Sequence, residues 1–411
     1  MSAKRRLFSG LVLIMGLLSV SLGGCGNRSR PLESVSLAFG CPEPLQEAYG
    51  PLVDAFNETY PDVTVEFLDQ GEYLNSGDLF LNSQYSLNEL TSNGGVLALD
   101  PYVTAAKDFD RDDFYPGLLE AFTRQGKLWA VPASADPIMI FYNRALFDEA
   151  GVSYPTSAWT DADFLEAAQA TTDVDAQTFG YVSTPHLPDA SIFVYQQGGR
   201  LVDDLQDPTR VTFDEPATIE AVTWYADLVN RHDVAPTPRQ RRVMFPGQQG
   251  VYQGILEERA AMWMGYFSER GGRYWPIEWF DHWGMVPLPR HGQSLASFAD
   301  TQAFFISADA EDPDAVWVLI DFLSEQSTAA GVPARRSVVE SDQYAAQVGD
   351  EIAVMARAAM DSAVVLPADV QGLEAVFDAF DDAVAAILRG DASPAEALSE
   401  AQQAAEAALG P

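Results

Sequence analysis

The spacing of hydrophobic and polar residues changes along the chain, from alternation with a period of two to helical spacing and back. These changes predict strands and helices in alternation. Residues 34–39 alternate with a period of two, which is typical of a strand with one buried face. Residues 45–57 carry an apolar stripe at helical spacing, and residues 60–67 return to a strand pattern. Because this order of strand, helix and strand continues further along the chain, the pattern predicts an α/β fold with largely parallel sheets.

The rest of the chain is organised around residues 126–155. A short strand ends at Pro132, because proline has no N–H to give to a sheet ladder, and residues 133–136 are predicted to form a loop. The continuous apolar run at 138–142 predicts a strand that is buried on both faces. A short helix is expected over residues 144–150.

Residues that are typical of helix N-termini predict where several further helices begin. Thr160 and Ser393 are each followed three residues later by an acidic residue, which is the pattern of a capping box. Pro216 suits the first position of a helix that continues to Val229. Residues 236–250 hold arginines among proline, glycine and glutamine, and they are predicted to form an exposed loop.

The segment 126–155 resembles the signature of the bacterial extracellular solute-binding proteins, the family that includes the maltose-binding protein of sugar ABC transporters. The resemblance rests on Gly126, Trp129, Ala130, Pro132, Tyr142, Asn143, Leu146, Phe147, Ala150, Gly151 and Pro155. Further similar segments lie at residues 260–267, 284–289 and 300–336. One departure is that only residues 68–77 stand where relatives insert a longer helix, which leaves the ligand size open.

The resemblance implies a two-lobed, periplasmic-binding-protein-like α/β fold of type II, with each lobe a mainly parallel sheet flanked by helices. A chain of 411 residues also exceeds the size of one ordinary core, so two lobes are expected from length. The expected lobes are residues 34–139 with 300–335, and residues 140–299 with 336–411. Crossings between them are expected near residues 137–142, 298–302 and 334–340.

The net charge and the histidine and cysteine content exclude several classes of binding partner. The net charge of −36 argues against nucleic acid, which requires a basic surface, and against docking on anionic lipid through a basic patch. The four histidines and two cysteines show no metal-ligand spacing. No metal or cofactor is therefore expected.

The beginning of the chain has the features of a bacterial lipoprotein leader. Residues 1–24 carry a basic start and an apolar run that is too short to span a membrane, so they predict a signal peptide. Residues 22–25 resemble a lipobox, which implies cleavage before Cys25 and lipid on its thiol. Residues 25–33 then form a tether, and Cys41 has no disulfide partner. A plain cleaved signal with an incidental cysteine is the alternative.

Candidate ligand contacts follow from the loops after predicted strands, where open α/β sheets bind ligands, and from the family resemblance. They are Glu43, Tyr85, Asp136, Tyr266, Phe267, Trp275, Asp300 and Arg335. A sugar site needs flat aromatic walls together with carboxylate, amide or guanidinium partners.

Most of the candidates also have a structural alternative. Asp136 is the preferred polar contact, with a surface carboxylate as its alternative, and Glu43 has a solvated turn as its alternative. Tyr266 and Phe267 suit core packing, and the aromatic stretch at 271–283 that contains Trp275 suits burial under a loop. The guanidinium of Arg335 is able to pair with an acid, while Asp300 either binds ligand or narrows the cleft.

Three functions remain open at this stage. The resemblance implies a lipid-anchored, extracytoplasmic solute-binding protein, a monomer without enzymatic activity, which captures a sugar or oligosaccharide and delivers it to ABC-transporter permease subunits. A secreted glycoside hydrolase would need two carboxylates across a sugar bond. A lipoprotein that binds a protein partner through its aromatic stretch is the third possibility.

Overall fold

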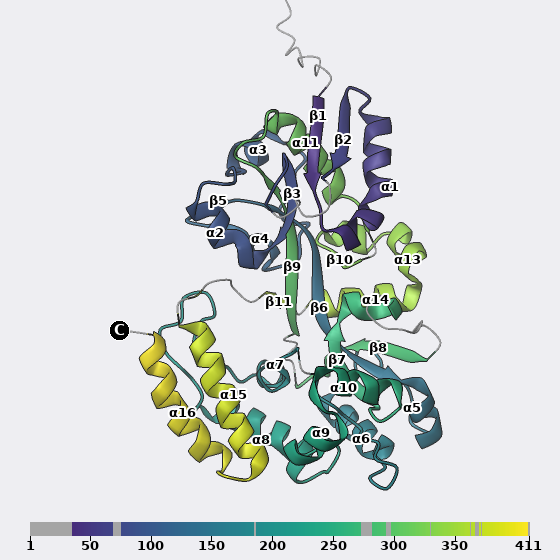
Figure 1. Ribbon diagram of the computed structural model, residues 1–411, viewed down its shortest axis with the longest axis vertical. Helices are drawn as coiled ribbons and strands as arrows, with labels where there is room; N and C mark the ends of the chain where they lie inside the picture. The colour runs from purple at the N-terminus through teal and green to yellow at the C-terminus, as the bar shows by residue number, and fades with distance from the viewer. Residues whose placement is uncertain are drawn as a thin grey trace, which may run out of the picture.

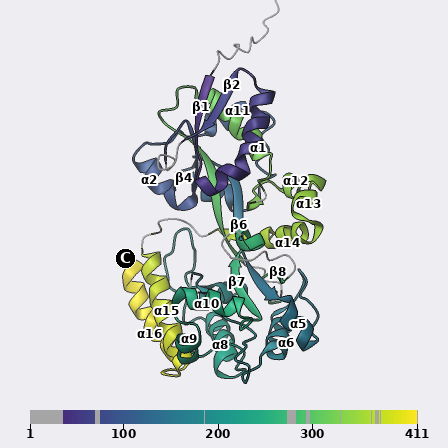
Figure 2. The ribbon, with the colours of Figure 1, turned by 45° about the vertical axis from the view of Figure 1, so that its right-hand side comes forward.

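The computed structural model describes residues 35–68, 75–184, 186–272, 282–292, 297–328, 330–361, 363–365, 370 and 372–409. The chain forms two bodies stacked along the long axis, here called the upper and lower body as they stand in Figure 1. The turned view in Figure 2 shows the same two bodies joined at the level of β6. Cys25, the signal and tether segments, Trp275 and most of residues 68–77 lie outside the described residues.

The upper body combines the first strands with helices from both early and late parts of the chain. Its elements are β1 (Val35–Gly40), α1 (Glu43–Thr59), β2 (Val63–Phe67), β3 (Leu79–Ser83), η1 (Gln84–Ser86), α2 (Leu87–Ser92), α3 (Asp100–Ala105), α4 (Leu118–Ala121), β4 (Thr123–Arg124), β5 (Lys127–Leu128), α11 (Pro313–Ser324) and β10 (Val332–Pro333).

The lower body is mainly helical around a small group of strands. Its elements are α5 (Arg144–Ala150), α6 (Asp161–Thr171), α7 (Asp189–Gln196), α8 (Pro216–Asn230), α9 (Pro238–Met244), α10 (Gly247–Leu256), β7 (Met262–Tyr266), η2 (Phe267–Gly272), β8 (Trp283–Pro287), α15 (Leu373–Arg389) and α16 (Pro394–Leu409). The elements between the bodies are β6 (Val131–Asn143), β9 (Ser297–Ile306), α12 (Arg336–Val339), α13 (Asp342–Val348), α14 (Asp350–Met360) and β11 (Ala363–Val365).

The sheet changes character between the two bodies. In the upper body β1 is parallel to both β2 and β3, as the sequence predicted. Strand β9 is antiparallel to β3 and to β6, and β6 is antiparallel to β7 and β8. Among the named strands the pairing is therefore mixed: only β1 with β2 and β3, and β9 with β11, are parallel. The expectation of a mainly parallel sheet in each lobe is wrong, because β6 and β9 are antiparallel to each other and to their other neighbours.

Strand β6 corrects the local prediction around Pro132. The expected loop at residues 133–136 is part of one continuous strand, and the register against β9 shifts between Pro132 and Ser134. A bulge at this point accommodates proline within a strand, since the local ladder is already interrupted. The consequence is that Asp136 lies on a rigid strand that joins the two bodies.

The helix-end signals are confirmed, and one loop prediction is wrong. Thr160 and Asp163 form the predicted capping box, and Gly151 ends α5 with a left-handed φ of 68°. Residues 236–250, expected to be a loop, instead contain α9 and the start of α10. Thr237 explains this difference, because its side chain accepts a hydrogen bond from the Gln240 N–H and forms a complete capping box.

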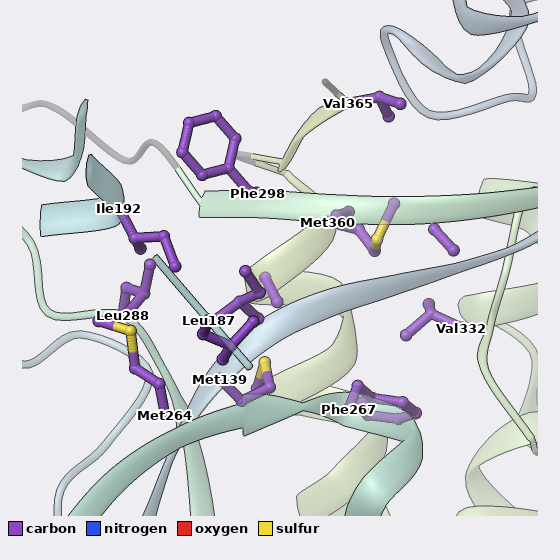
Figure 3. Close-up of a cluster of buried hydrophobic side chains, with 14 of the residues drawn as sticks. Met139, Leu187, Ile192, Met264, Phe267, Leu288, Phe298, Val332, Met360 and Val365 are labelled. Atoms are coloured by element: carbon purple, nitrogen blue, oxygen red, sulfur yellow. The ribbon is translucent and has the colours of Figure 1, made fainter. Parts of the chain in front are cut away.

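Buried apolar side chains hold the joining strands in place. Figure 3 shows Met139, Met264, Phe298, Met360 and Val365 among the labelled members of this cluster, which come from β6, β7, β9, α14 and β11. All five side chains are at most 6% exposed. Burial of each apolar side chain contributes roughly 1.5–3 kcal/mol, so the cluster fixes the strands that carry the polar residues described below.

The third passage between the bodies lies over α12 to α14. The Arg336 N–H donates to the Asp113 carbonyl at 2.7 Å, and the Ser337 hydroxyl donates to the Asp113 carboxylate at 2.7 Å, which keeps this segment on the upper body. Further along, Glu351 forms a 3.4 Å ion pair with Arg144 of the lower body. The chain therefore passes between the bodies for the third time after Ser337 and before Glu351. The exact lobe boundaries stay a prediction.

Within the part of the chain that the structure describes, none of the helices combines the length and the apolar character needed to cross a bilayer. The Cys41 thiol is buried and forms no disulfide with any described residue. Its burial raises the pKa of the thiol to about 12, so Cys41 is a protonated core residue at neutral pH.

Candidate functional site

A cavity of about 400 Å³ lies where the two bodies meet. The upper body contributes Pro42 and Tyr85, and the two joining strands contribute residues 134–136 and 300–302. The lower body contributes Ser268 from η2. The cavity is thus bordered by both bodies and by the strands that connect them, which is where a closing movement would enclose a ligand.

Two carboxylates face each other across the joining strands. Asp136 of β6 and Asp300 of β9 are directly opposed in the antiparallel register. Side chains at directly opposed positions project from the same face of a sheet and interact. Both residues are partly exposed, and they are the charged side chains among the described residues that line the cavity.

Asp136 is anchored to the lower body through Ser268. The Ser268 N–H donates to Asp136 Oδ1 at 2.8 Å, and the Ser268 hydroxyl donates to Oδ2 at 2.5 Å. Burial raises the pKa of Asp136 to about 7, and the negative charges of Asp300 and Glu269 act in the same direction. The two hydrogen bonds from Ser268 oppose this shift without cancelling it.

Asp300 accepts hydrogen bonds from tyrosines of both bodies. The Tyr85 hydroxyl of the upper body donates to Asp300 Oδ1 at 2.8 Å, and the Gln84 amide donates to the same oxygen at 3.2 Å. The Tyr266 hydroxyl of the lower body also bonds to this carboxylate. Burial, followed by the charge of Asp300, raises the pKa of both tyrosines, so their hydroxyls stay protonated and available as donors.

A polar chain in the lower body fixes the position of Tyr266. The Tyr266 N–H donates to Glu269 Oε1 at 2.9 Å, and the same oxygen lies 3.0 Å from His186 Nε2. The Tyr252 hydroxyl lies 2.8 Å from His186 Nδ1. This chain holds the backbone at the end of β7, and through it the ring that reaches Asp300.

Four of the predicted residues thus come together: Asp136, Asp300, Tyr85 and Tyr266. Their neighbours Ser268, Gln84, Glu269 and His186 were missed by sequence reasoning. No local pattern identifies these neighbours, because most of their hydrogen bonds join residues that are between 83 and 216 positions apart in the chain. The exception is the bond between Glu269 and Tyr266, which are three positions apart. The usable signals in the sequence are that Gln84 is next to Tyr85, that Ser268 and Glu269 follow Tyr266 closely, and that His186 follows the predicted strand at 179–182.

Phe267 and Arg335 lie elsewhere. Phe267 is completely buried in the apolar cluster of Figure 3, and the Arg270 guanidinium lies 3.7 Å from its ring centroid. Arg335 is 4% exposed and donates to the Ser324 hydroxyl, with the Asp113 carboxylate 3.5 Å away. Neither residue lines the cavity between the bodies, and their packing agrees with the structural alternatives that the sequence left open.

Glu43 is exposed in the first turn of α1, and the neighbouring Pro42 and Pro44 line the cavity while Glu43 does not. Trp275 lies outside the described residues. Within the described chain, no three histidine, cysteine or acidic side chains gather in a way that would hold a metal ion. What the site offers is hydrogen-bond acceptors, hydroxyl donors and aromatic faces.

Comparison with known proteins places the chain in a family. The sequence model described as "bacterial extracellular solute-binding protein" matches residues 43–330, which is more than half of the chain. A curated relative, the erythritol/L-threitol-binding protein of Mycolicibacterium smegmatis, is 26% identical over 165 residues. That match covers 34% of this chain and 34% of the relative, so the chain matches about a third of the relative's length.

Solved structures share the fold over nearly the whole chain. The sugar-binding protein MalE of Xanthomonas citri has a TM-score of 0.72 at 20% identity, and the match covers 91% of this chain and 97% of the MalE chain. An ABC substrate-binding protein of Listeria monocytogenes in complex with cycloalternan has a TM-score of 0.68 at 21% identity, covering 92% and 99%. At these identities the likeness shows the two-lobed fold alone. Together with the family match it shows that the chain belongs to the bacterial extracellular solute-binding proteins.

Proposed function

We propose that this protein captures a sugar, a short oligosaccharide or a related polyol in the cavity between its two bodies and closes over it. The single observation that carries the proposal is the convergence of Tyr85 from the upper body and Tyr266 from the lower body on Asp300 inside that cavity. A residue that both bodies contact is well placed to couple ligand binding to closure.

The chemistry of the cavity supports a polyhydroxylated ligand. Carboxylates accept hydrogen bonds from hydroxyl groups, and tyrosine rings provide flat faces for the C–H side of a sugar. A volume of about 400 Å³ is near the lower end of the range of roughly 300–1,000 Å³ for small-molecule sites, which favours one or two sugar rings over a long chain. Relatives named above were described with cycloalternan or as binding erythritol and L-threitol, which are also polyhydroxylated.

The roles of the residues follow from their contacts. Asp136, Asp300, Tyr85 and Tyr266 are proposed to contact ligand, while Ser268 positions Asp136. Glu43 and Trp275 stay predictions from the sequence alone. Phe267 and Arg335 are not part of the proposed contact set, because burial removes both from the cavity.

The cellular context is part of the same proposal. We infer that residues 1–24 are removed, that Cys25 carries lipid, and that the mature monomer stays outside the cytoplasmic membrane to deliver solute to permease subunits of an ABC importer. The leader sequence and the family's extracytoplasmic character support this. Labelling with a radioactive fatty acid, lost in Cys25→Ala, would test the anchor independently of ligand binding.

The experiment for the ligand is native mass spectrometry of the purified protein with mixed saccharides and polyols. We expect one bound molecule of a hexose, disaccharide or polyol mass, and its loss in Asp136→Ala, while circular dichroism and cooperative unfolding of the apo variant show that its fold is intact. The matched control, Asp309→Ala, removes an exposed carboxylate just beyond the end of β9 and should bind normally. Full-strength binding by Asp136→Ala would remove this residue from the site, and cleavage of the saccharide would favour a hydrolase instead.

A further inference from the structure

A second and larger cavity, of about 530 Å³, lies entirely within the lower body. Helices α8, α9 and α15 border it, and Figures 1 and 2 show these helices side by side at the base of the molecule. None of its lining residues is shared with the cavity between the bodies. The two cavities are therefore separate sites.

The inner wall of this cavity is apolar and aromatic. Tyr181, Tyr225, Leu228, Val229 and Phe245 line it. The hydroxyl of Tyr181 is already engaged, because it donates to the Asp189 carboxylate. The wall can therefore offer ring faces and aliphatic surface to the body of a ligand, and aromatic side chains favour an aromatic partner.

Three arginines line the same cavity: Arg241, Arg242 and Arg389. This gathering stands out in a chain that has a net charge of −36 and only 24 lysines and arginines. No carboxylate is among the described lining residues. A guanidinium has five N–H donors in a planar fork that matches a carboxylate or sulfonate, so the lining complements an anion.

The arginines are only partly neutralised by their surroundings. Arg241 donates to the Ser183 hydroxyl at 2.6 Å, and Arg389 donates to Asp391 at 2.7 Å. Arg242 is exposed and has no hydrogen bond or ion pair with any described residue. The side chain of Arg241 is half-buried, so its interaction with an anion is screened less than that of an exposed arginine.

Two acids near the lining tyrosines leave the positive charge of Arg241 available. Asp189 and Asp381 act electrostatically on the lining tyrosines Tyr181 and Tyr225, but neither acid lines the cavity. Burial raises the pKa of Asp189 to about 7, and the charge of Arg241 only partly offsets this. Near neutral pH Asp189 therefore carries less than a full negative charge against Arg241.

We propose that this cavity binds a small aromatic carboxylate or sulfonate, with its rings against the apolar wall and its anionic group on Arg241 and Arg242. The site is independent of the proposed solute cavity, and its occupancy does not require that proposal to be correct.

The test is isothermal titration calorimetry of the full chain with naphthoate and with naphthamide, which has the same rings without the charge. We expect one site for naphthoate, binding at least tenfold weaker for naphthamide, and weaker naphthoate binding at high salt. Equal affinity for the two compounds, or no binding of naphthoate, would overturn the proposal.

Variants then locate the site. Arg241→Ala should weaken naphthoate binding at least tenfold, whereas Arg239→Ala, an exposed arginine of the same helix that does not line the cavity, should bind like the wild type. Ala385→Leu adds apolar volume to the wall of the cavity and should block binding while all arginines are kept. If Arg241→Ala fails to fold, Arg242→Ala provides the same test. Unchanged naphthoate binding in the folded arginine variants and in Ala385→Leu would place the ligand elsewhere and refute the assignment.

Discussion

Asp136 stays protonated at pH values where an exposed aspartate is already ionised, because burial raises its pKa from 3.8 to about 7. Between these two values the native state holds a proton that the unfolded chain has released. The stability contribution of this residue is therefore complete below about pH 4, falls as pH rises, and is lost above about pH 7.

The variant Asp136→Asn tests this directly, since an amide resembles the protonated acid in shape and in hydrogen-bonding capacity. The free energy of unfolding of the wild type relative to this variant should fall between pH 5 and 7, by at most about 1.4 kcal/mol per pH unit. Urea denaturation at each pH gives the difference. A difference that does not change with pH would show that Asp136 is ionised throughout, despite its burial.

Arg335 illustrates how a family motif identifies a position without giving its role. Its guanidinium donates to Ser324, lies near Asp113, and stands 4.6 Å from the ring centroid of Phe114. Removal of one partner from a buried, hydrogen-bonded ion pair typically costs about 3–5 kcal/mol. We expect Arg335→Leu to lower the free energy of unfolding by about 3 kcal/mol and to leave solute affinity unchanged in the folded protein. A large loss of affinity at unchanged stability would return Arg335 to the binding site.

At the scale of elements, α9 depends on a local signal within a stretch whose composition suggests a loop. Thr237 and Gln240 satisfy each other's backbone N–H groups, and Pro238 occupies the first turn where its missing N–H has no cost. Thr237→Ala should lower the stability of the protein by about 1 kcal/mol in thermal or urea unfolding. Thr237→Ser keeps the accepting hydroxyl and is the matched control. Equal stability of the two variants would mean that packing alone holds α9.

The same distinction between local and distant information explains what the sequence could predict. The capping box at Thr160, the helix end at Gly151 and the strand β1 depend on neighbouring residues, and all three were predicted correctly. The path of β6 through Pro132 depends on the strand that pairs with it, β9, so no local rule could show the bulge.

The candidate site divides in the same way. Asp136 and Asp300 were identifiable as residues near strand ends, but their pairing requires the register between strands more than 150 residues apart in the chain. Burial decides the remaining cases: Tyr266 is partly exposed and reaches Asp300, while the next residue, Phe267, is completely buried. Aromatic character alone does not tell these two neighbours apart.

At the scale of the whole molecule, the contacts of Asp300 link the two bodies before any ligand binds. Tyr85 and Tyr266 reach this carboxylate from opposite bodies, and separation of the bodies would break at least one of the two hydrogen bonds. These bonds therefore favour the closed arrangement. If solute binds best to that arrangement, its apparent affinity falls in proportion to the closed population.

The variant Tyr85→Phe keeps the ring and removes the hydroxyl, so it isolates this effect. A hydrogen bond to a charged group contributes about 1.5–3 kcal/mol, which predicts a rise of about tenfold or more in the solute Kd. The radius of gyration of the ligand-free variant, measured by small-angle X-ray scattering, should exceed that of the wild type, and saturating solute should bring both to the same smaller value. Tyr154→Phe is the matched control, because its hydroxyl also donates to an aspartate at 2.8 Å but both partners, Tyr154 and Asp148, lie in the lower body. If Tyr85→Phe and Tyr154→Phe scatter and bind alike, the Tyr85 hydroxyl does not couple the two bodies, and closure must depend on contacts made by the solute itself.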